Sequence, residues 1–299
     1  MKILIADGLD QNGQNILKEA GHELVVKHYE PDDLVKAILE YEGIIVRSAT
    51  KVPRAVIDAG KNLKLIARAG TGIDNIDHQY ARSLGIAVLN APGANSYSVA
   101  ELVFAHLLSL ARSLNQATNS LREGRWEKKN FGNGFELAGK TLGIVGFGRI
   151  GKIVARLAIA WGIRVIVYDV AEIETELAVT IVTLDELLHT SDFITLHTPK
   201  SSQPLITEKE ISMMKRGVLI VNCARGNAID EKALLDGLNS GQVGGAGLDV
   251  YSEEPPKNLE LVRHPRVSCT PHIGANTIEA QQRVGVEIAQ RIVDFIKTL

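Results

Sequence analysis

The C-terminal half of the chain carries an arginine, a glutamate and a histidine, each shortly after an apolar run. These residues are Arg225, Glu254 and His272. Taken singly, each has an ordinary explanation: a surface ion pair, a solvated loop acid and a histidine in the core. Together, a guanidinium binds an anion, an imidazole moves a proton near neutral pH, and a carboxylate orients the imidazole. The combination indicates a catalytic constellation.

A glycine pattern earlier in the chain indicates a nucleotide site. Thr141–Gly151 is an apolar run that passes into a helical stretch. Gly146 permits a tight turn, Gly148 lets the backbone approach a pyrophosphate, and Gly151 lets helix and strand pack closely. Asp169 ends the next apolar run, where an acid accepts hydrogen bonds from ribose hydroxyls and repels a 2′-phosphate. The sequence predicts a site for NAD rather than NADP; a helix-capping aspartate is the structural alternative.

Short apolar runs alternate with helically spaced stretches, which is typical of parallel strands covered on both faces. The first block of runs is Ile3–Ala6, Leu24–Val26, Gly43–Val46, Leu63–Ala67 and Ile86–Leu89. The second block is Thr141–Val145, Arg164–Tyr168, Asp192–His197, Gly217–Asn222, Gly244–Val250 and Val267–Thr270. The pattern predicts an α/β protein with two doubly wound parallel sheets.

Two segments depart from this alternation. Apolar residues recur at three- and four-residue intervals over Ser96–Leu114, which predicts one helix of about five turns. Thr277–Lys297 is helical as well, and we expect it to return to the first lobe. The expected domains are therefore a substrate domain, residues 1–94 with 276–299, and a dinucleotide-binding domain, residues 95–275.

Composition excludes several classes of protein. The chain has 299 residues, with 33 Lys and Arg against 35 Asp and Glu, for a formal net charge of -2. This balance provides no basic field for nucleic acid or acidic lipid. Two cysteines make no disulfide framework, no apolar stretch is long enough to span a membrane, and the apolar run before Asp7 is too short for the hydrophobic region of a secretory leader. We expect a cytoplasmic protein without nucleic-acid or membrane partners and without a metal site.

These motifs resemble those of the D-isomer-specific 2-hydroxyacid dehydrogenases. The resemblance covers essentially the whole chain and implies a flavodoxin-like substrate lobe, a Rossmann NAD-binding lobe, and hydride exchange between NAD and a 2-hydroxy acid. The matching segments are Gly146–Gly151 with Asp169, His197-Thr198-Pro199, Asn222-Cys-Ala-Arg225-Gly226, Asp249 with Glu254-Pro255, and Pro271-His272-Ile-Gly274.

The resemblance also implies roles for single residues. His272 would be the general acid/base at the substrate's C2 oxygen, Glu254 would bind its other ring nitrogen, and Arg225 would bind the substrate carboxylate. The implied substrate-binding residues are Arg47, Ser48, Arg68, Ala69 and Gly70, with backbone amides around Ala69 and Gly70 completing the carboxylate site. The implied NAD-binding residues are Thr71, Gly146, Gly148, Arg149, Ile150, Gly151, Asp169, His197, Thr198, Pro199, Cys223, Ala224, Asp249, Gly274 and Ala275.

Several of these implied roles are more specific. Arg149 and Ile150 would lie at the pyrophosphate, and Asp249 would bind the nicotinamide carboxamide. Cys223 is expected to pack, because hydride transfer needs no thiolate.

The substrate is implied by Val46–Thr50, Ala67–Asn75 and Asn95–Glu101, which are similar to family members that oxidise 3-phosphoglycerate in the serine pathway. Arg47 and Arg68 would hold the phosphate, although Ala49 stands where some relatives carry a second arginine. Ordinary surface charges are the alternative explanation for both arginines.

Two other functions stay open. One is reduction of hydroxypyruvate or glyoxylate on the same fold, and the other is an NAD-responsive interaction protein, since some relatives are transcriptional corepressors. The resemblance implies a homodimer or a dimer of dimers built on the Ser96–Leu114 helix and the polar stretch around Trp126. A helix that covers its own sheet is the alternative. Because the chain ends in a helix, the regulatory domain of longer relatives is expected to be absent.

Overall fold

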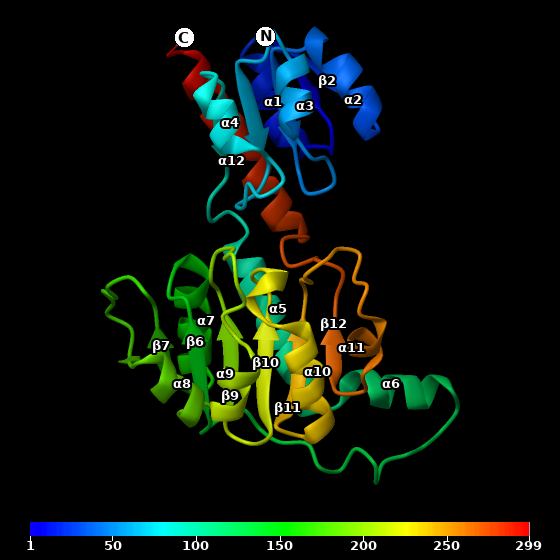
Figure 1. Ribbon diagram of the computed structural model, residues 1–299, viewed down its shortest axis with the longest axis vertical. Coiled ribbons are helices and arrows are strands. Elements are labelled where there is room, and N and C mark those ends of the chain that lie inside the picture. Colours follow the sequence, from blue (N-terminus) through cyan, green and yellow to red (C-terminus); the bar gives the residue numbers. More distant parts are fainter. Residues whose placement is uncertain (299) are drawn as a thin grey trace. The chain divides into compact units, whose positions relative to one another are not determined.

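The computed structural model describes residues 1–298, which form two compact units (Figure 1). The first unit comprises Met1–Asn95 with Ala275–Leu299, and the second comprises Ser96–Gly274. The assignment of substrate binding to the first unit and of the dinucleotide to the second stays a prediction at this point. Within the described residues, no helix combines the length and the apolar character that crossing a bilayer requires.

The first unit is built on a five-stranded parallel sheet of order β2-β1-β3-β4-β5. Side chains alternate between its faces, so Leu4 of β1 packs in one apolar cluster and its neighbours Ile3 and Ile5 in another. The strands are β1 (Lys2–Ile5), β2 (Glu23–Val26), β3 (Gly43–Val46), β4 (Leu65–Arg68) and β5 (Ala87–Asn90). The helices are α1 (Gln11–Glu19), α2 (Pro31–Ala37), α3 (Arg54–Ala59), α4 (His78–Ser83) and α12 (Ile278–Ile296), with a 3-10 turn at Ile38–Glu40.

Helix α12 completes the first unit from the far end of the chain. It lies against α1, where a Cβ on Gly13 would come within 2.4 Å of the Gly285 carbonyl oxygen. Two glycines therefore allow the helices to meet at backbone distance. Ile288 and Ile292 of α12 are fully buried against the sheet, so burial of this apolar face stabilises the helix in the first unit.

The second unit has a seven-stranded parallel sheet of order β12-β11-β10-β9-β6-β7-β8. Its strands are β6 (Thr141–Val145), β7 (Arg164–Tyr168), β8 (Thr180–Ile181), β9 (Phe193–Leu196), β10 (Val218–Asn222), β11 (Val243–Leu248) and β12 (Val267–Cys269). Its helices are α5 (Ser96–Ala111), α6 (Leu114–Arg122), α7 (Arg149–Ala160), α8 (Leu184–Thr190), α9 (Glu208–Met213), α10 (Glu231–Ser240) and α11 (Leu259–Arg263), with a 3-10 turn at Gly226–Ala228.

Both strand orders are doubly wound, which confirms the predicted fold class. The first is the flavodoxin order, and the second is the Rossmann order with one strand added. Strand β8 was not predicted, because its two exposed residues, Thr180 and Ile181, form no apolar run.

The single helix predicted over Ser96–Leu114 is wrong at its end. Helix α5 stops at Ala111, and Ser113 has a left-handed conformation with φ of 50° and ψ of 40° before α6 begins. The carbonyl of Ala111 accepts a hydrogen bond from the Phe135 amide, so a distant segment takes the acceptor that a longer helix would use. Leu114, expected in the apolar stripe, is 48% exposed.

Candidate active site

The turn between β6 and α7 depends on its glycines. Gly146 has φ of +94°, and a Cβ there would lie 2.6 Å from the His197 carbonyl oxygen. A Cβ on Gly151 would lie 2.3 Å from the Gly146 oxygen, whereas the space around Gly148 is open. Helix α7 begins at Arg149 and Ile150 without a side-chain cap. Its first amides thus have the arrangement that binds a pyrophosphate.

Asp169 follows β7 and holds the glycine turn. Its Oδ2 accepts a hydrogen bond of 2.6 Å from the Phe147 amide, and its Oδ1 accepts one of 3.0 Å from the Ala171 amide. Each carboxylate oxygen has a second lone pair with which to accept a ribose hydroxyl. The next helix, α8, is capped by Thr183, so the helix-cap alternative for Asp169 is wrong.

His197 lies beside the same turn, directly after β9, and precedes Thr198 and Pro199. Its Nε2 lies 3.1 Å from the Thr195 hydroxyl, and burial lowers its pKa to about 3, so the ring is neutral. Within residues 1–298, its buried Nδ1 has no hydrogen-bond partner. A buried ring nitrogen without a partner costs free energy unless a polar group reaches it. The glycine turn, the uncapped helix and this nitrogen fit a dinucleotide.

Arg225 is positioned by the turn that follows β10. The Asn222 side chain donates to the Arg225 carbonyl at 2.9 Å and accepts from the Ala224 amide at 3.1 Å. The Arg225 Nη1 donates to the Ala224 carbonyl at 2.8 Å. A Cβ on Gly226 would lie 1.8 Å from the Tyr251 carbonyl oxygen, so glycine lets this turn lie against the 249–254 loop. Sequence reasoning did not assign a role to Asn222.

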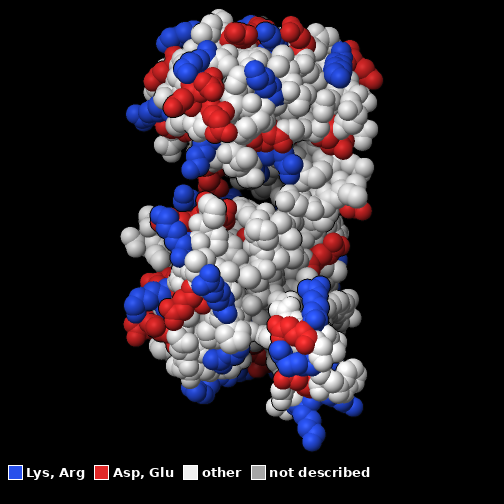
Figure 2. Space-filling model, turned by 90° about the vertical axis from the view of Figure 1, so that its right-hand side faces the viewer, with Lys and Arg blue, Asp and Glu red and all other residues white. Residues whose placement is uncertain are grey.

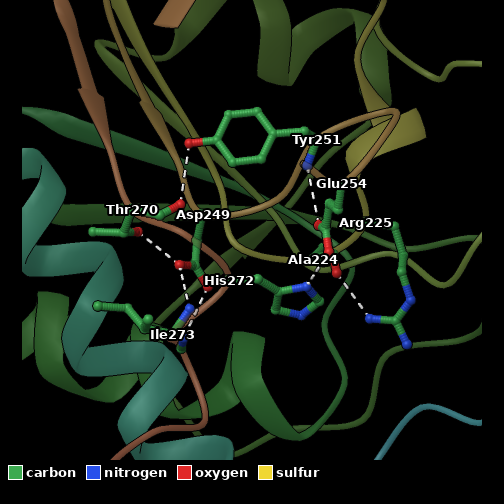
Figure 3. A network of polar contacts seen from close by, with 9 residues as sticks. Ala224, Arg225, Asp249, Tyr251, Glu254, Thr270, His272 and Ile273 are labelled. Atoms are coloured by element: carbon green, nitrogen blue, oxygen red, sulfur yellow. Dashed lines mark hydrogen bonds and ion pairs between the residues drawn. The ribbon is translucent and has the colours of Figure 1, made fainter. Parts of the chain in front are cut away.

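Glu254 and His272 form a hydrogen-bonded pair (Figure 3). The His272 Nδ1 lies 2.8 Å from the Glu254 Oε2, and the Glu254 Oε1 accepts a bond of 3.3 Å from the Tyr251 amide. The side chains of His272 and Glu254 are 43% and 40% exposed, so a small molecule can reach them. The second unit therefore brings Arg225, Glu254 and His272 to one edge of its sheet.

The pair shifts both titrations toward the ionised forms. The hydrogen bond that His272 donates to Glu254 raises the pKa of His272 above its ordinary value, and this outweighs the effect of burial, which lowers it. Burial by itself would raise the pKa of Glu254, but the hydrogen bond and charge of His272 hold that pKa below its ordinary value. Arg225 opposes the rise at His272 and favours the ionised Glu254. The arrangement stabilises an imidazolium–carboxylate pair.

Asp249 organises the loop that carries His272. Its Oδ1 accepts from the Thr270 hydroxyl at 2.6 Å and from the Ile273 amide at 2.8 Å, and its Oδ2 accepts from the Gly274 amide at 2.8 Å. Its carbonyl accepts from the His272 amide at 2.9 Å. His272 itself has φ of 53°, which costs free energy in a residue with a side chain. Asp249 thus maintains a loop that would otherwise relax.

Cys223 and Ala224 lie buried between Asn222 and Arg225. Burial, aided by the charge of Asp249, raises the pKa of the Cys223 thiol well above its usual range. A protonated, buried thiol is a packing group and not a nucleophile.

The proposed phosphate ligands lie in the first unit. Arg47 follows β3, and Arg68 is the last residue of β4, the strand paired with β3, in which it lies opposite Val46. The Arg47 Nη2 donates to the Asn276 Oδ1 at 3.2 Å. A Cβ on Gly70 would fall 1.7 Å from the Arg68 Nη1, so the glycine leaves room for the guanidinium.

The 47–50 loop is held by two residues that sequence reasoning missed. Asp7 accepts from the amides of Arg47 and Thr50 at 2.7 and 2.9 Å and from the Thr50 hydroxyl at 2.6 Å. The Asn75 side chain donates to the carbonyls of Arg47 and Thr50 at 2.7 Å each. Ser48 is exposed at the tip of this loop. An aspartate directly after the apolar run Ile3–Ala6 was the available signal.

The amides expected to bind the substrate carboxylate already have acceptors. The Ala69 amide donates to the Val46 carbonyl and the Gly70 amide to the Arg68 carbonyl, both at 2.8 Å. Carboxylate binding there stays a proposal and requires shared or rearranged hydrogen bonds. The Thr71 hydroxyl donates to the Asn95 Oδ1 at 2.8 Å, and Ala275 begins the returning segment, where its carbonyl accepts from the Gln281 side chain at 2.7 Å.

Charged residues of both signs are interspersed over the face drawn in Figure 2. On this face, neither sign of charge is gathered into one large field. In the part of the chain that the structure describes, no three His, Cys, Asp or Glu side chains form a group suited to a metal ion.

The comparisons with known proteins agree on one family. Residues 104–274 match the family described as D-isomer specific 2-hydroxyacid dehydrogenase, NAD binding domain. A hydroxypyruvate reductase of Thermotoga maritima is 50% identical over 97% of both chains. A D-3-phosphoglycerate dehydrogenase of Sus scrofa is 46% identical over 99% of this chain, which spans 56% of that relative's length.

Solved structures of known proteins share the fold of this chain over its whole length. An NAD-dependent formate dehydrogenase from Staphylococcus aureus in complex with NAD has a TM-score of 0.88 at 31% identity, covering 100% of this chain and 96% of that one. The family model, these identities and the two doubly wound sheets show that the chain belongs to the D-isomer specific 2-hydroxyacid dehydrogenases and is an NAD-binding oxidoreductase.

Proposed function

We propose that this protein oxidises 3-phosphoglycerate at C2 to 3-phosphooxypyruvate, the step that opens serine biosynthesis from a glycolytic intermediate. The observation that carries the proposal is the pair of arginines, Arg47 and Arg68, at the carboxyl ends of two paired strands of the first unit. Open α/β sheets bind ligands at that edge, and guanidinium groups suit a phosphate dianion. The 46% identical D-3-phosphoglycerate dehydrogenase supports this assignment.

The second unit supplies groups for proton transfer. When bound, NAD would accept a hydride at C4 of its nicotinamide. Because the His272 Nδ1 is engaged by Glu254, we assign to Nε2 the removal of the proton from the substrate's C2 hydroxyl. By accepting the Nδ1 proton, Glu254 holds the His272 ring in the Nδ1–H tautomer and stabilises the imidazolium that forms. Arg225 binds the substrate carboxylate and polarises the C2 oxygen.

The glycine turn, the first turn of α7 and Asp169 would hold the cofactor. The amides at the start of α7 would bind the pyrophosphate, with Arg149 and Ile150 at its edge. Asp169 would accept the ribose hydroxyls, and its charge would exclude a 2′-phosphate. Asp249 already has three donors, so its proposed contact with the nicotinamide carboxamide would add to an established structural role.

Reduction of hydroxypyruvate is the second candidate. It is favoured by the 50% identical hydroxypyruvate reductase, which this chain matches over 97% of both lengths. Ala49, where some relatives carry another arginine, also fits a smaller anion.

A matched substrate panel tests the two candidates. The reduced cofactor is followed by its absorbance with 3-phosphooxypyruvate and hydroxypyruvate in one direction, and with 3-phosphoglycerate and D-glycerate in the other. NAD and NADP are compared for each. We expect the higher kcat/KM with the phosphorylated member of both pairs and with NAD. Preference for the unphosphorylated members would contradict the first candidate and favour the second.

We further propose a homodimer or a dimer of dimers in the cytoplasm. Trp126 is 81% exposed, and Leu121 of α6 is exposed beside it in a shallow groove that includes Phe131. A second copy covering this apolar group would remove it from water. Light scattering at micromolar concentration should give a mass of at least twice 32.4 kDa; a stable species at the single-chain mass would refute the assembly.

A further inference from the structure

A buried chain of hydrogen bonds runs from helix α5 to the loop that carries His272. His106 of α5 is 2% exposed. Its Nδ1 lies 2.9 Å from the Ser268 Oγ, and its Nε2 lies 3.2 Å from the Thr270 Oγ1. The Thr270 Oγ1 lies 2.6 Å from the Asp249 Oδ1. No step of the mechanism above uses His106.

The donors and acceptors in this chain can be assigned from the chemistry of its ends. An ionised carboxylate only accepts, so the single hydroxyl proton of Thr270 is donated to Asp249. Thr270 must then accept from His106, which places the imidazole proton on Nε2. The other nitrogen, Nδ1, accepts from the Ser268 hydroxyl. Burial lowers the pKa of His106, against a smaller opposing effect of the Asp249 charge, so the ring is neutral and can play both roles.

The fold reserves space for this imidazole. A Cβ on Gly247 of β11 would lie 2.6 Å from the Cβ of His106. Any side chain at position 247 would therefore push α5 away from the sheet and open the hydrogen bond to Thr270. Helix α5 thus approaches the sheet closely where it buries the polar His106 ring. A contact that served packing alone would not need a polar ring at this point.

The other end of the chain sets the backbone of His272. The same Asp249 carboxylate accepts hydrogen bonds from the Ile273 and Gly274 amides. His272, which lies between β12 and these two residues, has φ of 53°. The direction of the His272 ring, and hence its bond to Glu254, depends on this strained backbone. A change at Thr270 or His106 reaches His272 through the Asp249 carboxylate.

We propose that His106 is a positioning residue for the reaction. As the neutral Nε2–H tautomer, it orients Thr270 toward Asp249, and so keeps the 272–274 loop in the geometry that pairs His272 with Glu254. The inference rests on the proposed role of His272 and extends the site to helix α5, which has no part in the mechanism proposed above.

The first test compares matched variants in kinetics. His106→Phe and Thr270→Val remove the polar chain, whereas Thr270→Ser keeps the hydroxyl, and His189→Gln changes an exposed histidine of α8 as a control. We expect kcat to fall roughly tenfold to a hundredfold in the first two, as for a small misplacement of a catalytic group. The KM for NAD should stay within about twofold, because the glycine turn is untouched. Thr270→Ser and the control should retain activity.

The pH profile separates positioning from general destabilisation. The groups that act on the titration of His272 are Glu254, Asp249 and Arg225. If the loop relaxes, the bond to Glu254 weakens, and the midpoint attributed to His272 moves to lower pH in His106→Phe and Thr270→Val. Lower thermal stability with an unmoved midpoint and an unchanged kcat would overturn the proposal.

The second test needs no turnover, so it stands even if the proposed substrate is wrong. Nitrogen-15 spectra of the histidine rings report tautomer and charge directly. We expect His106 to stay neutral with its proton on Nε2 at neutral pH and above, and His272 to titrate at lower pH in Thr270→Val than in the parent protein. A His106 proton on Nδ1, a charged His106 at neutral pH, or an unchanged His272 titration would each overturn the inference.

Discussion

Asp7 in the first unit and Asp249 in the second use the same device. Asp7 lies two residues after the end of β1, and Asp249 directly follows β11. Each accepts hydrogen bonds from two backbone amides and, at 2.6 Å, from one threonine hydroxyl, and all three donors belong to the loop after a neighbouring strand. Asp7 in this way holds the loop of Arg47, and Asp249 holds the loop of His272. An aspartate that binds several amides replaces a missing strand partner and makes an irregular loop rigid.

The two devices differ in what lies behind them. The Asp7 side chain is 5% exposed, but its nearest imidazole, His28, is 55% exposed at 3.7 Å. Behind Asp249 lies the buried His106, reached through Thr270. A guanidinium on a long side chain can adjust to a phosphate, whereas a ring that transfers a proton must be held at hydrogen-bond distance. The depth of the support thus matches the precision that each proposed task requires.

The largest effect should follow removal of the proton-transfer group. His272→Ala is expected to lower kcat by about 10²–10⁴-fold while leaving NAD affinity nearly unchanged, because positioned acid–base catalysis contributes that much. Steady-state kinetics with fluorescence titration of NAD measures both quantities. Near-normal turnover would remove His272 from the mechanism and with it the reason for the deeper support.

The comparison between the two aspartates is tested by replacing each of them, in turn, with asparagine. Asp249→Asn should lower kcat by about tenfold to a hundredfold, because a misplaced His272 ring is penalised in the transition state. Asp7→Asn should instead raise the KM for 3-phosphoglycerate and leave kcat within about threefold, because it loosens a binding loop. Equal effects on kcat in both variants would show that the loops do not differ as proposed.

Removal of the Arg47 guanidinium tests whether the loop held by Asp7 binds a phosphate. Arg47→Ala should lower kcat/KM for 3-phosphoglycerate by about tenfold to a hundredfold, mostly through KM, because a charge-assisted hydrogen bond contributes roughly 1.5–3 kcal/mol. Turnover of D-glycerate should barely change. Matching losses on both substrates would assign Arg47 to support of the loop and weaken the case for a phosphorylated substrate.

The smallest expected effect concerns pH. Since Glu254 raises the pKa of His272, oxidation should increase with pH through a midpoint above about 6.5, as the ring becomes the neutral base, and reduction should decrease through the same midpoint. Glu254→Gln keeps a hydrogen-bonding group and removes the charge. It should move both midpoints to lower pH, with a smaller loss of kcat than His272→Ala. Unmoved midpoints would mean that another group controls the profile.

Local patterns in the sequence were sufficient for the fold class and the main motifs. Apolar runs such as Thr141–Val145 and Arg164–Tyr168 coincide with β6 and β7, because strands covered on both faces need near-continuous apolar residues. The Gly146–Gly151 pattern and the family resemblance led to the NAD-binding domain, which the family match shows. The break at Ser113 was not predictable, because the competing donor for Ala111 comes from Phe135, far along the chain.

The residues proposed to carry the chemistry were therefore visible in the sequence, but the hydrogen bonds that hold them were not. Arg225, Glu254 and His272 have reactive side chains next to recognisable strand ends, which the sequence shows directly. That Asp249 binds three donors of the His272 loop, and that His106 lies behind it, was decided by the pairing of β11 with β12 and by the approach of α5 at Gly247. Hydrogen bonds between distant segments depend on packing, and packing is a property of the whole fold rather than of any local pattern.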